Sequence, residues 1–150
     1  MLGTELLITG GALALVVVLG LIAHEWSHAL VLRLAAIDYT ISYAPDRRGG
    51  VLGLLRSCPW AVVQPHPTGA EPPWILRVAA LAPLFLAVPA FVFVATGSGT
   101  SQPPVVTAAL IGWLACAIPS PQDFSVVFHA HTALQGQTET NGTRRVPHAD

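Results

Sequence analysis

Charged residues are scarce in this sequence, at 10% of its 150 residues, and lysine is absent altogether. Soluble domains usually carry about 25% charged residues, so this deficit argues against a soluble globular protein. The net charge of −1 gives no electrostatic basis for binding nucleic acid. The two cysteines, Cys58 and Cys116, are isolated and form no CxxC pair, which excludes a disulfide framework.

The chain instead has long apolar segments. Hydrophobic residues make up 53% of the sequence, and the mean hydropathy is +0.60. Apolar runs cover residues 6–36, 74–96 and 105–118, and about 20 apolar residues suffice for a membrane helix. The opening MLGTE has no basic residue, unlike the start of a secretory signal peptide. The sequence therefore predicts an all-α multi-pass membrane protein with about three transmembrane helices.

The segment between the first two apolar runs, residues 37–73, mixes β-forming residues with turn residues. We expect YTISYA and VLGLL to pair as a hairpin around a turn at residues 46–50, with WAVVQ as a further short strand. The proline-rich QPHPTGAEPP is typical of a loop. A short β-rich loop after the first helix is thus part of the predicted fold.

Prolines interrupt the second half of the sequence. Pro83 and Pro89 lie inside the second apolar run, where membrane helices tolerate them. They could belong to a substrate gate or to ordinary helix packing, and we favour packing. Pro119 and Pro121 end the third run, and a new helix is predicted to begin there with Ser120 as its N-cap.

Domain organisation and orientation follow from the polar residues. We expect one membrane-embedded domain over residues 1–134 and a polar, disordered tail over residues 135–150. Five of the seven arginines flank or occupy the loop between the first two spans, and the other two lie in the tail. By the positive-inside rule, this predicts a cell-membrane protein with its N-terminus outside and its C-terminus in the cytoplasm.

The stretch LIAHEWSHALVL places an H-E-x-x-H motif, residues 24–28, inside the first apolar run. On a helix, His24 and His28 share one face and can present ring nitrogens to a single metal ion. Glu25 then lies beside the metal without binding it, which is the position of a general base that activates water for attack on a carbonyl group.

Ionisable residues in a membrane helix need a compensating interaction, because each costs roughly 2.5–3.5 kcal/mol at the bilayer centre. A bound dication supplies one for all three residues of the motif. Bonding to a neighbouring helix and haem ligation are the alternatives. The apolar context favours a metal, and for this motif the metal is zinc.

A catalytic zinc site normally has three protein ligands, so one more must come from elsewhere. The candidates in the sequence are Asp38, His66, Glu71, Asp123, His129 and His131. With the predicted topology, Asp123 lies near the cytoplasmic end of the third span, at the depth of His24 and His28, and is the preferred ligand. Ser120 to Asp123 also fits an S-x-x-D capping box, in which the acid bonds back to the N-cap amide without any metal.

With these residues in view, the chain resembles the site-2 protease family of intramembrane zinc metalloproteases. The resemblance rests on HEWSH in the first long membrane helix, the β-rich loop after it, and the later sequence PSPQD, residues 119–123. The family pattern N-x-x-P-x-P-x-L-D-G is kept in its prolines and its acid. The chain lacks the asparagine, has one residue fewer before the aspartate, and has Phe124 in place of the glycine. It is most similar to small, minimal members of the family.

The resemblance implies that His24, His28 and Asp123 bind Zn²⁺ and that Glu25 is the catalytic base. The implied activity is zinc-dependent hydrolysis of peptide bonds inside the membrane, with a transmembrane protein or peptide as substrate and the lipid bilayer as surroundings. The alternative function is that of a non-catalytic metal-binding membrane protein acting as a scaffold or regulator. An ion transporter is a further rival, and it would require the chain to form oligomers.

Overall fold

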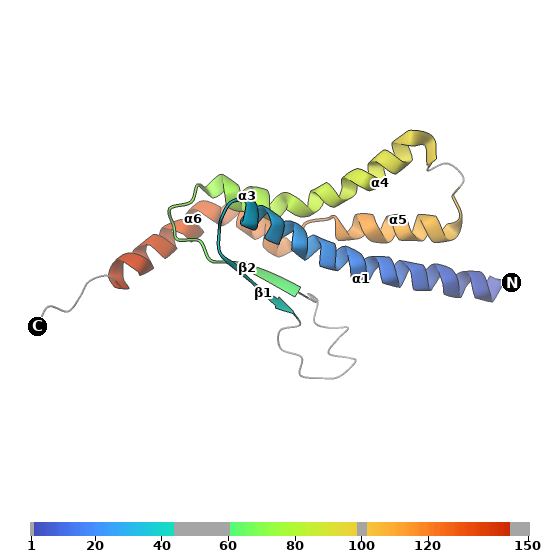
Figure 1. Cartoon of the computed structure of the whole chain (residues 1–150), viewed down its shortest axis with the longest axis horizontal. Helices are drawn as coiled ribbons and strands as arrows, with labels where there is room; N and C mark the ends of the chain where they lie inside the picture. Colours follow the sequence, from blue (N-terminus) through green and yellow to red (C-terminus); the bar gives the residue numbers. More distant parts are fainter. Residues whose placement is uncertain (1, 44–60, 99–101, 145–150) are drawn as a thin grey trace, which may run out of the picture.

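The computed structural model of the chain describes residues 2–43, 61–98 and 102–144, and it is mostly helical. A long first helix is followed by a two-stranded sheet and then by a series of helical segments (Figure 1). The elements are α1 (Leu2–Leu34), β1 (Tyr39–Tyr43), β2 (Ala61–Pro65), α3 (Pro73–Leu81), η1 (Ala82–Leu86), α4 (Ala87–Phe93), η2 (Val94–Ser98), α5 (Pro104–Cys116) and α6 (Pro121–Arg144).

Among the described residues, three helical stretches are long and apolar enough to cross a membrane: Gly3–Leu34, Pro73–Gly97 and Pro104–Thr132. The predicted fold class, three membrane-spanning helices with a short sheet after the first, is confirmed. The chain is therefore built as a membrane protein. Its outer helix surfaces carry exposed apolar side chains such as Leu7 and Phe85, as lipid-facing surfaces do.

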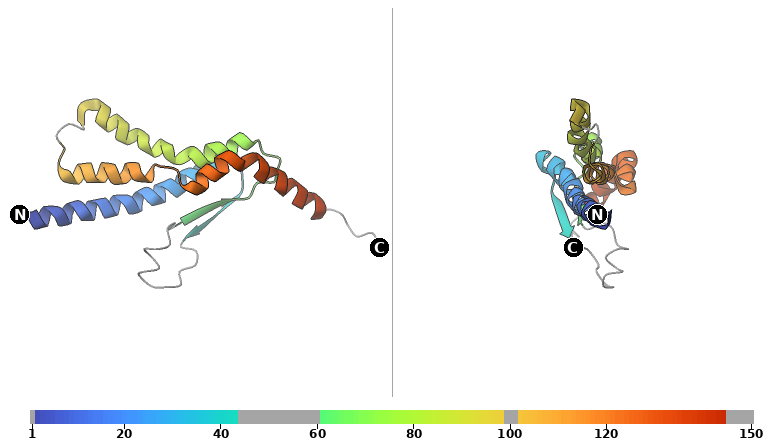
Figure 2. Two further views of the ribbon diagram at one scale, coloured as in Figure 1. Left: turned by 180° about the vertical axis from the view of Figure 1, so that it is seen from behind. Right: turned by 90° about the vertical axis from the view of Figure 1, so that its right-hand side faces the viewer.

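Helix α5 runs alongside part of the longer helix α1 (Figure 2). Two glycines permit the close approach. A Cβ atom on Gly20 would lie 2.8 Å from the Cβ and Sγ atoms of Cys116, and one on Gly112 would lie 2.8 Å from a methyl group of Leu13. Small residues at a membrane helix interface let the two backbones pack closely, and here they bring the end of α5 against the HEWSH turn.

Proline shapes the second span. Pro83 and Pro89 have no N–H to donate to the carbonyls four residues before them, and the helix tightens into the 3₁₀ segment η1 between α3 and α4. The indole Nε1–H of Trp113 on α5 donates to the carbonyl of Leu86 at 2.6 Å. This bond ties the end of η1 to the neighbouring helix α5.

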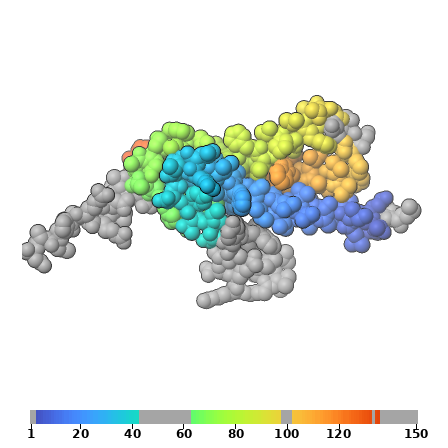
Figure 3. Space-filling model, viewed as in Figure 1, coloured from blue at the N-terminus to red at the C-terminus, as the bar shows by residue number. Residues whose placement is uncertain are grey.

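The well-buried core lies at the end of the molecule where α1, α3 and α6 meet. Leu32, Leu76, Ala79, Ala130 and Leu134 are all at most 5% exposed there. The sheet packs beneath this end (Figure 1), and the helices α1, α4 and α5 extend away from it as an elongated arm (Figure 3). The sheet and the core therefore occupy the same end of the three spans as the HEWSH turn.

One expectation differs from the structure, and another lies outside the described residues. Strand β1 pairs with β2, in antiparallel register with Ile41 opposite Val63, and the expected hairpin with VLGLL around a turn at 46–50 lies outside the described residues. Helix α6 continues to Arg144, so residues 135–144 are helical where a disordered tail was expected. Their polar composition did not end the helix because no proline interrupts them.

Candidate metal centre

His24 and His28 lie one turn apart on α1, and both are buried, at 7% and 8% exposure. Each ring makes a hydrogen bond to a main-chain carbonyl of another helix. His24 Nδ1 lies 2.7 Å from the carbonyl oxygen of Cys116, and His28 Nδ1 lies 2.7 Å from that of Ala79. Because a carbonyl can only accept, both Nδ1 atoms carry the proton, and a neutral ring then offers its Nε2 lone pair to a metal.

Proline makes the Cys116 carbonyl available. In a continuing helix it would accept from the amide of residue 120, or in a tighter turn from that of residue 119. Pro119 has no N–H, and the Ser120 amide donates instead to Asp123 Oδ2 at 2.6 Å. The break between α5 and α6 therefore leaves a carbonyl for His24.

Pro83 has the same effect on the second span. The carbonyl of Ala79 would normally accept from residue 83, which has no N–H. The Ala79 carbonyl instead accepts a hydrogen bond from the amide of Ala82, three residues later, and its second lone pair accepts from the His28 ring. Pro83 therefore contributes to the site through the helix carbonyl that orients His28.

Asp123 belongs to the first turn of α6, and its carboxylate has two roles at once. Oδ2 accepts the Ser120 amide while Ser120 Oγ accepts the Asp123 amide at 3.2 Å, which completes the predicted capping box. The same carboxylate faces both histidines, with Oδ2 3.5 Å from His24 Nε2 and Oδ1 3.3 Å from His28 Nε2. Capping holds the carboxylate in the position where it meets the two rings.

One donor atom from each of His24, His28 and Asp123 lies within 4.8 Å of the others, and together they could hold a metal ion. Within the described ranges no second group of this kind occurs. The other sequence candidates lie elsewhere: His66 contacts the hydroxyl of Thr40, and Glu71 accepts from Thr68 and Gly69 in the loop. The remaining candidates, Asp38, His129 and His131, are not in the group.

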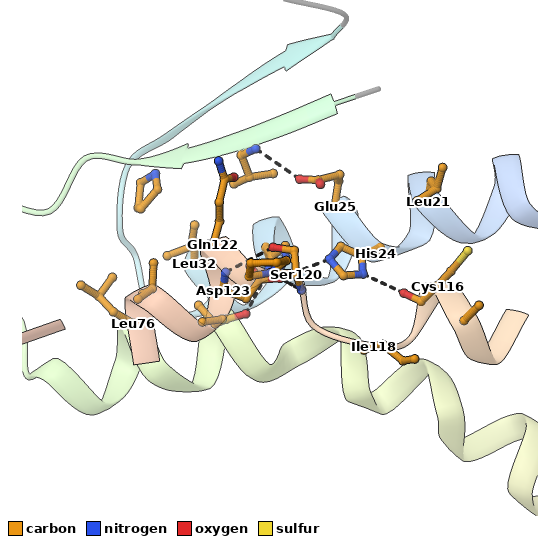
Figure 4. A pocket seen from close by; sticks show the side chains of 18 residues that line it. Leu21, His24, Glu25, Leu32, Leu76, Cys116, Ile118, Ser120, Gln122 and Asp123 are labelled. Carbon is orange, nitrogen blue, oxygen red and sulfur yellow. Dashed lines mark hydrogen bonds and ion pairs between the residues drawn. The ribbon is translucent and has the colours of Figure 1, made fainter. Parts of the chain in front are cut away.

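Glu25 lies beside this group without joining it. Its half-buried carboxylate accepts the main-chain N–H of Val63 on β2, with Oε2 at 3.3 Å from the nitrogen. Figure 4 shows the Glu25 carboxylate directed at the strand, while the His24 ring is directed at Asp123. The motif glutamate and the ligand set therefore share one site but face different parts of it.

A cavity of about 460 Å³ is lined by His24, Glu25, His28 and Asp123, among other residues. Its wall is mostly apolar and comes from α1, β2, α3, the end of α5 and the start of α6 (Figure 4). Ser120 and Gln122 are further polar residues of the lining. An apolar cavity with a few convergent polar groups is the usual form of a binding site for a small molecule or a segment of chain.

Sequence reasoning missed the groups that act through the main chain. The carbonyls of Cys116 and Ala79 and the N–H of Val63 have no side-chain signature. The prolines three residues after Cys116 and four residues after Ala79 give a partial signal, because proline has no N–H to donate to these carbonyls. No such signal marks Val63, since its position depends on how the sheet packs against α1.

Comparison with known proteins adds no identification. The chain matches no protein-family model, no curated protein and no solved structure. The site must therefore be interpreted from its own geometry.

Proposed function

We propose that this protein is a zinc-dependent intramembrane protease that hydrolyses peptide bonds of a transmembrane protein or peptide. The observation that carries the proposal is the convergence of His24, His28 and Asp123 in one cavity that also contains Glu25. Two nitrogens and a carboxylate oxygen are a donor set of catalytic zinc sites, which keep one position open.

The donor atoms lie close enough together for one ion. Ligand atoms about 2.0–2.2 Å from zinc at the corners of a tetrahedron lie roughly 3.3–3.6 Å apart. Each Asp123 oxygen approaches one ring, Oδ2 at 3.5 Å from His24 Nε2 and Oδ1 at 3.3 Å from His28 Nε2, and one donor atom from each residue lies within 4.8 Å of the others. The carbonyl bonds at both Nδ1 atoms fix the tautomer that binds a metal. Zinc, when bound, lowers the pKa of a water molecule to about 7 and polarises the scissile carbonyl.

The remaining residues have roles that follow from their positions. Glu25 accepts the proton of the attacking water and returns it to the leaving amine. The apolar wall of the cavity excludes bulk water and accommodates apolar substrate side chains. A substrate helix must unwind before cleavage, since its carbonyls are bonded within the helix, and the strand β2 beside the cavity offers a main-chain edge to the unwound segment.

The proposed orientation has the N-terminus outside and the C-terminus in the cytoplasm. The beginning of α1, the end of α4 and the beginning of α5 lie together at one end of the molecule, and the end of α6 lies at the opposite end (Figure 1). Arginines are absent from the first end and present near the other, as the positive-inside rule requires. In this orientation His24, His28 and Asp123 lie toward the cytoplasmic side of the membrane.

The first experiment is zinc analysis of detergent-purified protein together with hydrolysis of a quenched fluorescent peptide of apolar sequence. The wild type should bind about one zinc per chain and cleave the peptide. Glu25→Gln should keep the zinc and lose hydrolysis, and His24→Ala should lose both. Cleavage by Glu25→Gln at the native rate would refute the base assignment. Zinc without any hydrolysis in the wild type would favour the non-catalytic scaffold or regulator instead.

A further inference from the structure

The contact between Glu25 and Val63 has a consequence for how the site is controlled. Strand β2 is paired with β1 on one side, and the described residues provide no strand on the other side. The His66 amide donates to the Asp38 carbonyl, so the even-numbered residues of β2 direct their main-chain groups at β1. Val63, an odd-numbered residue, directs its N–H and C=O away from β1 and toward α1.

This outer edge of β2 has few donors. The outward-directed residues of the strand are Ala61, Val63 and Pro65, and proline has no N–H. Val63 and Pro65 both line the cavity that contains the metal group. The Val63 N–H is thus the outer-edge donor at the cavity, and the Glu25 carboxylate already accepts it at 3.3 Å.

We propose that the Val63 N–H holds Glu25 in a resting orientation and releases it when an extended substrate segment pairs with the outer edge of β2. The segment needs the same N–H for its first main-chain hydrogen bond. Pairing therefore removes the hydrogen-bond donor of Glu25, and the carboxylate becomes free to turn toward His24, His28 and Asp123. The proposal rests on the proposed protease function and adds that docking of the substrate backbone frees the base.

Two physical points support this release. A carboxylate that accepts an N–H is held in place by the bond, and here it is held facing the strand, away from the Asp123 side of the cavity. At 3.3 Å the bond is also slightly longer than the roughly 2.7–3.2 Å usual for an N–H···O bond, so a substrate carbonyl in strand geometry can replace it. A resting enzyme with its base turned away hydrolyses short, unpaired peptides slowly and gains activity only from chains long enough to reach the strand.

Val63→Pro tests the release, because it removes the outward N–H without removing a bond of the β1–β2 ladder. The matched control is Val63→Ala, which shortens the side chain and keeps the N–H. The assay compares a blocked dipeptide, too short to reach β2, with an apolar peptide of ten residues. We expect Val63→Pro to cleave the dipeptide about three- to tenfold faster than Val63→Ala and to lose the advantage of the long peptide. Equal dipeptide rates in the two variants would overturn the proposal.

A second measurement does not depend on activity or on the proline variant. In the wild type, the NMR signal of the Val63 amide should shift when an uncleavable ten-residue apolar peptide is added. The Gln64 amide, which faces β1, should keep its position. A bound peptide that leaves the Val63 signal unchanged would contradict the release. A shift at Val63 in a protein that cleaves neither peptide would remove the proposed protease function while the exchange of partners stands.

Discussion

Gly20→Ala tests whether the packing of α1 on α5 positions His24, a proposed metal ligand. The added Cβ atom would lie 2.8 Å from the Cβ and Sγ atoms of Cys116, about 0.6 Å inside the 3.4 Å of ordinary contact. Cys116 Cβ is close to the main chain and cannot rotate away, so the end of α5 must move. Overpacking of this kind costs about 1–3 kcal/mol of stability.

The same residue carries the carbonyl that accepts from His24 Nδ1 at 2.7 Å. A shift on the order of 0.6 Å takes this bond to the limit of good hydrogen-bond geometry, about 3.2 Å. Loss of such an outer partner of a metal-binding histidine typically weakens metal binding about 10–100-fold. We therefore expect Gly20→Ala to raise the zinc dissociation constant by that factor.

The assay is zinc competition with a chromophoric chelator in detergent, with thermal unfolding measured on the same samples. Gly11→Ala is the matched control, because nothing lies within 4 Å of a Cβ at that position. The double variant Gly20→Ala with Cys116→Gly removes the clashing atoms and should recover zinc affinity. Equal zinc affinity in Gly20→Ala and Gly11→Ala would refute the link between helix packing and the site.

Three further predictions concern the site and its surroundings. Asp123→Asn should lower zinc affinity at least tenfold and keep α6 capped. Ser120→Ala should keep zinc affinity and lose about 1 kcal/mol of unfolding free energy. An equal loss of zinc affinity in both variants would make the cap the essential feature. Pro83→Ala supplies an N–H that competes with the His28 ring for the Ala79 carbonyl. Zinc affinity, measured by competition with a chelator, should therefore fall, and the melting temperature should not. Partial burial acts to raise the pKa of Glu71, but hydrogen bonds from two amides and a hydroxyl outweigh it and hold that pKa below its ordinary value of 4.5. A carboxyl group whose pKa is lowered by folding stabilises the protein at pH values above its unfolded-state pKa, and this stabilisation is lost as the pH falls through its folded-state pKa. The difference in unfolding free energy between wild type and Glu71→Gln should therefore shrink below about pH 4.5. A constant difference down to pH 3 would contradict this.

The sequence was sufficient for the parts of the structure that depend on local pattern. Apolar length predicted the three spans, and the S-x-x-D spacing predicted the cap at Ser120. Helical periodicity placed His24 and His28 on one face, and depth in the membrane selected Asp123 over the other candidates. These features require only the period of a helix and the thickness of a bilayer.

Features that depend on the packing of separate elements were beyond the sequence. The pairing of β1 with β2 joins residues 18 to 26 positions apart, and no turn chemistry fixes that register. The contact between Glu25 and Val63 follows from that pairing and from the placement of the sheet against α1. Sequence reasoning assigned Glu25 a chemical role but had no means to detect its partner.

The two roles considered for Asp123 were alternatives only at the level of sequence. A carboxylate has two oxygens with about four acceptor sites, and a capping box needs one of them. The Ser120 amide restrains Oδ2, so the carboxylate cannot rotate freely, and Oδ1 is thereby fixed toward His28. Because Pro119 ends α5 just before this turn, one break in the third span frees the carbonyl that orients His24 and also begins the helix that presents Asp123. The main-chain bond of the cap, from the Ser120 amide to Oδ2, survives Ser120→Ala and therefore can hold the carboxylate of the third span at the two histidines of the first even in that variant.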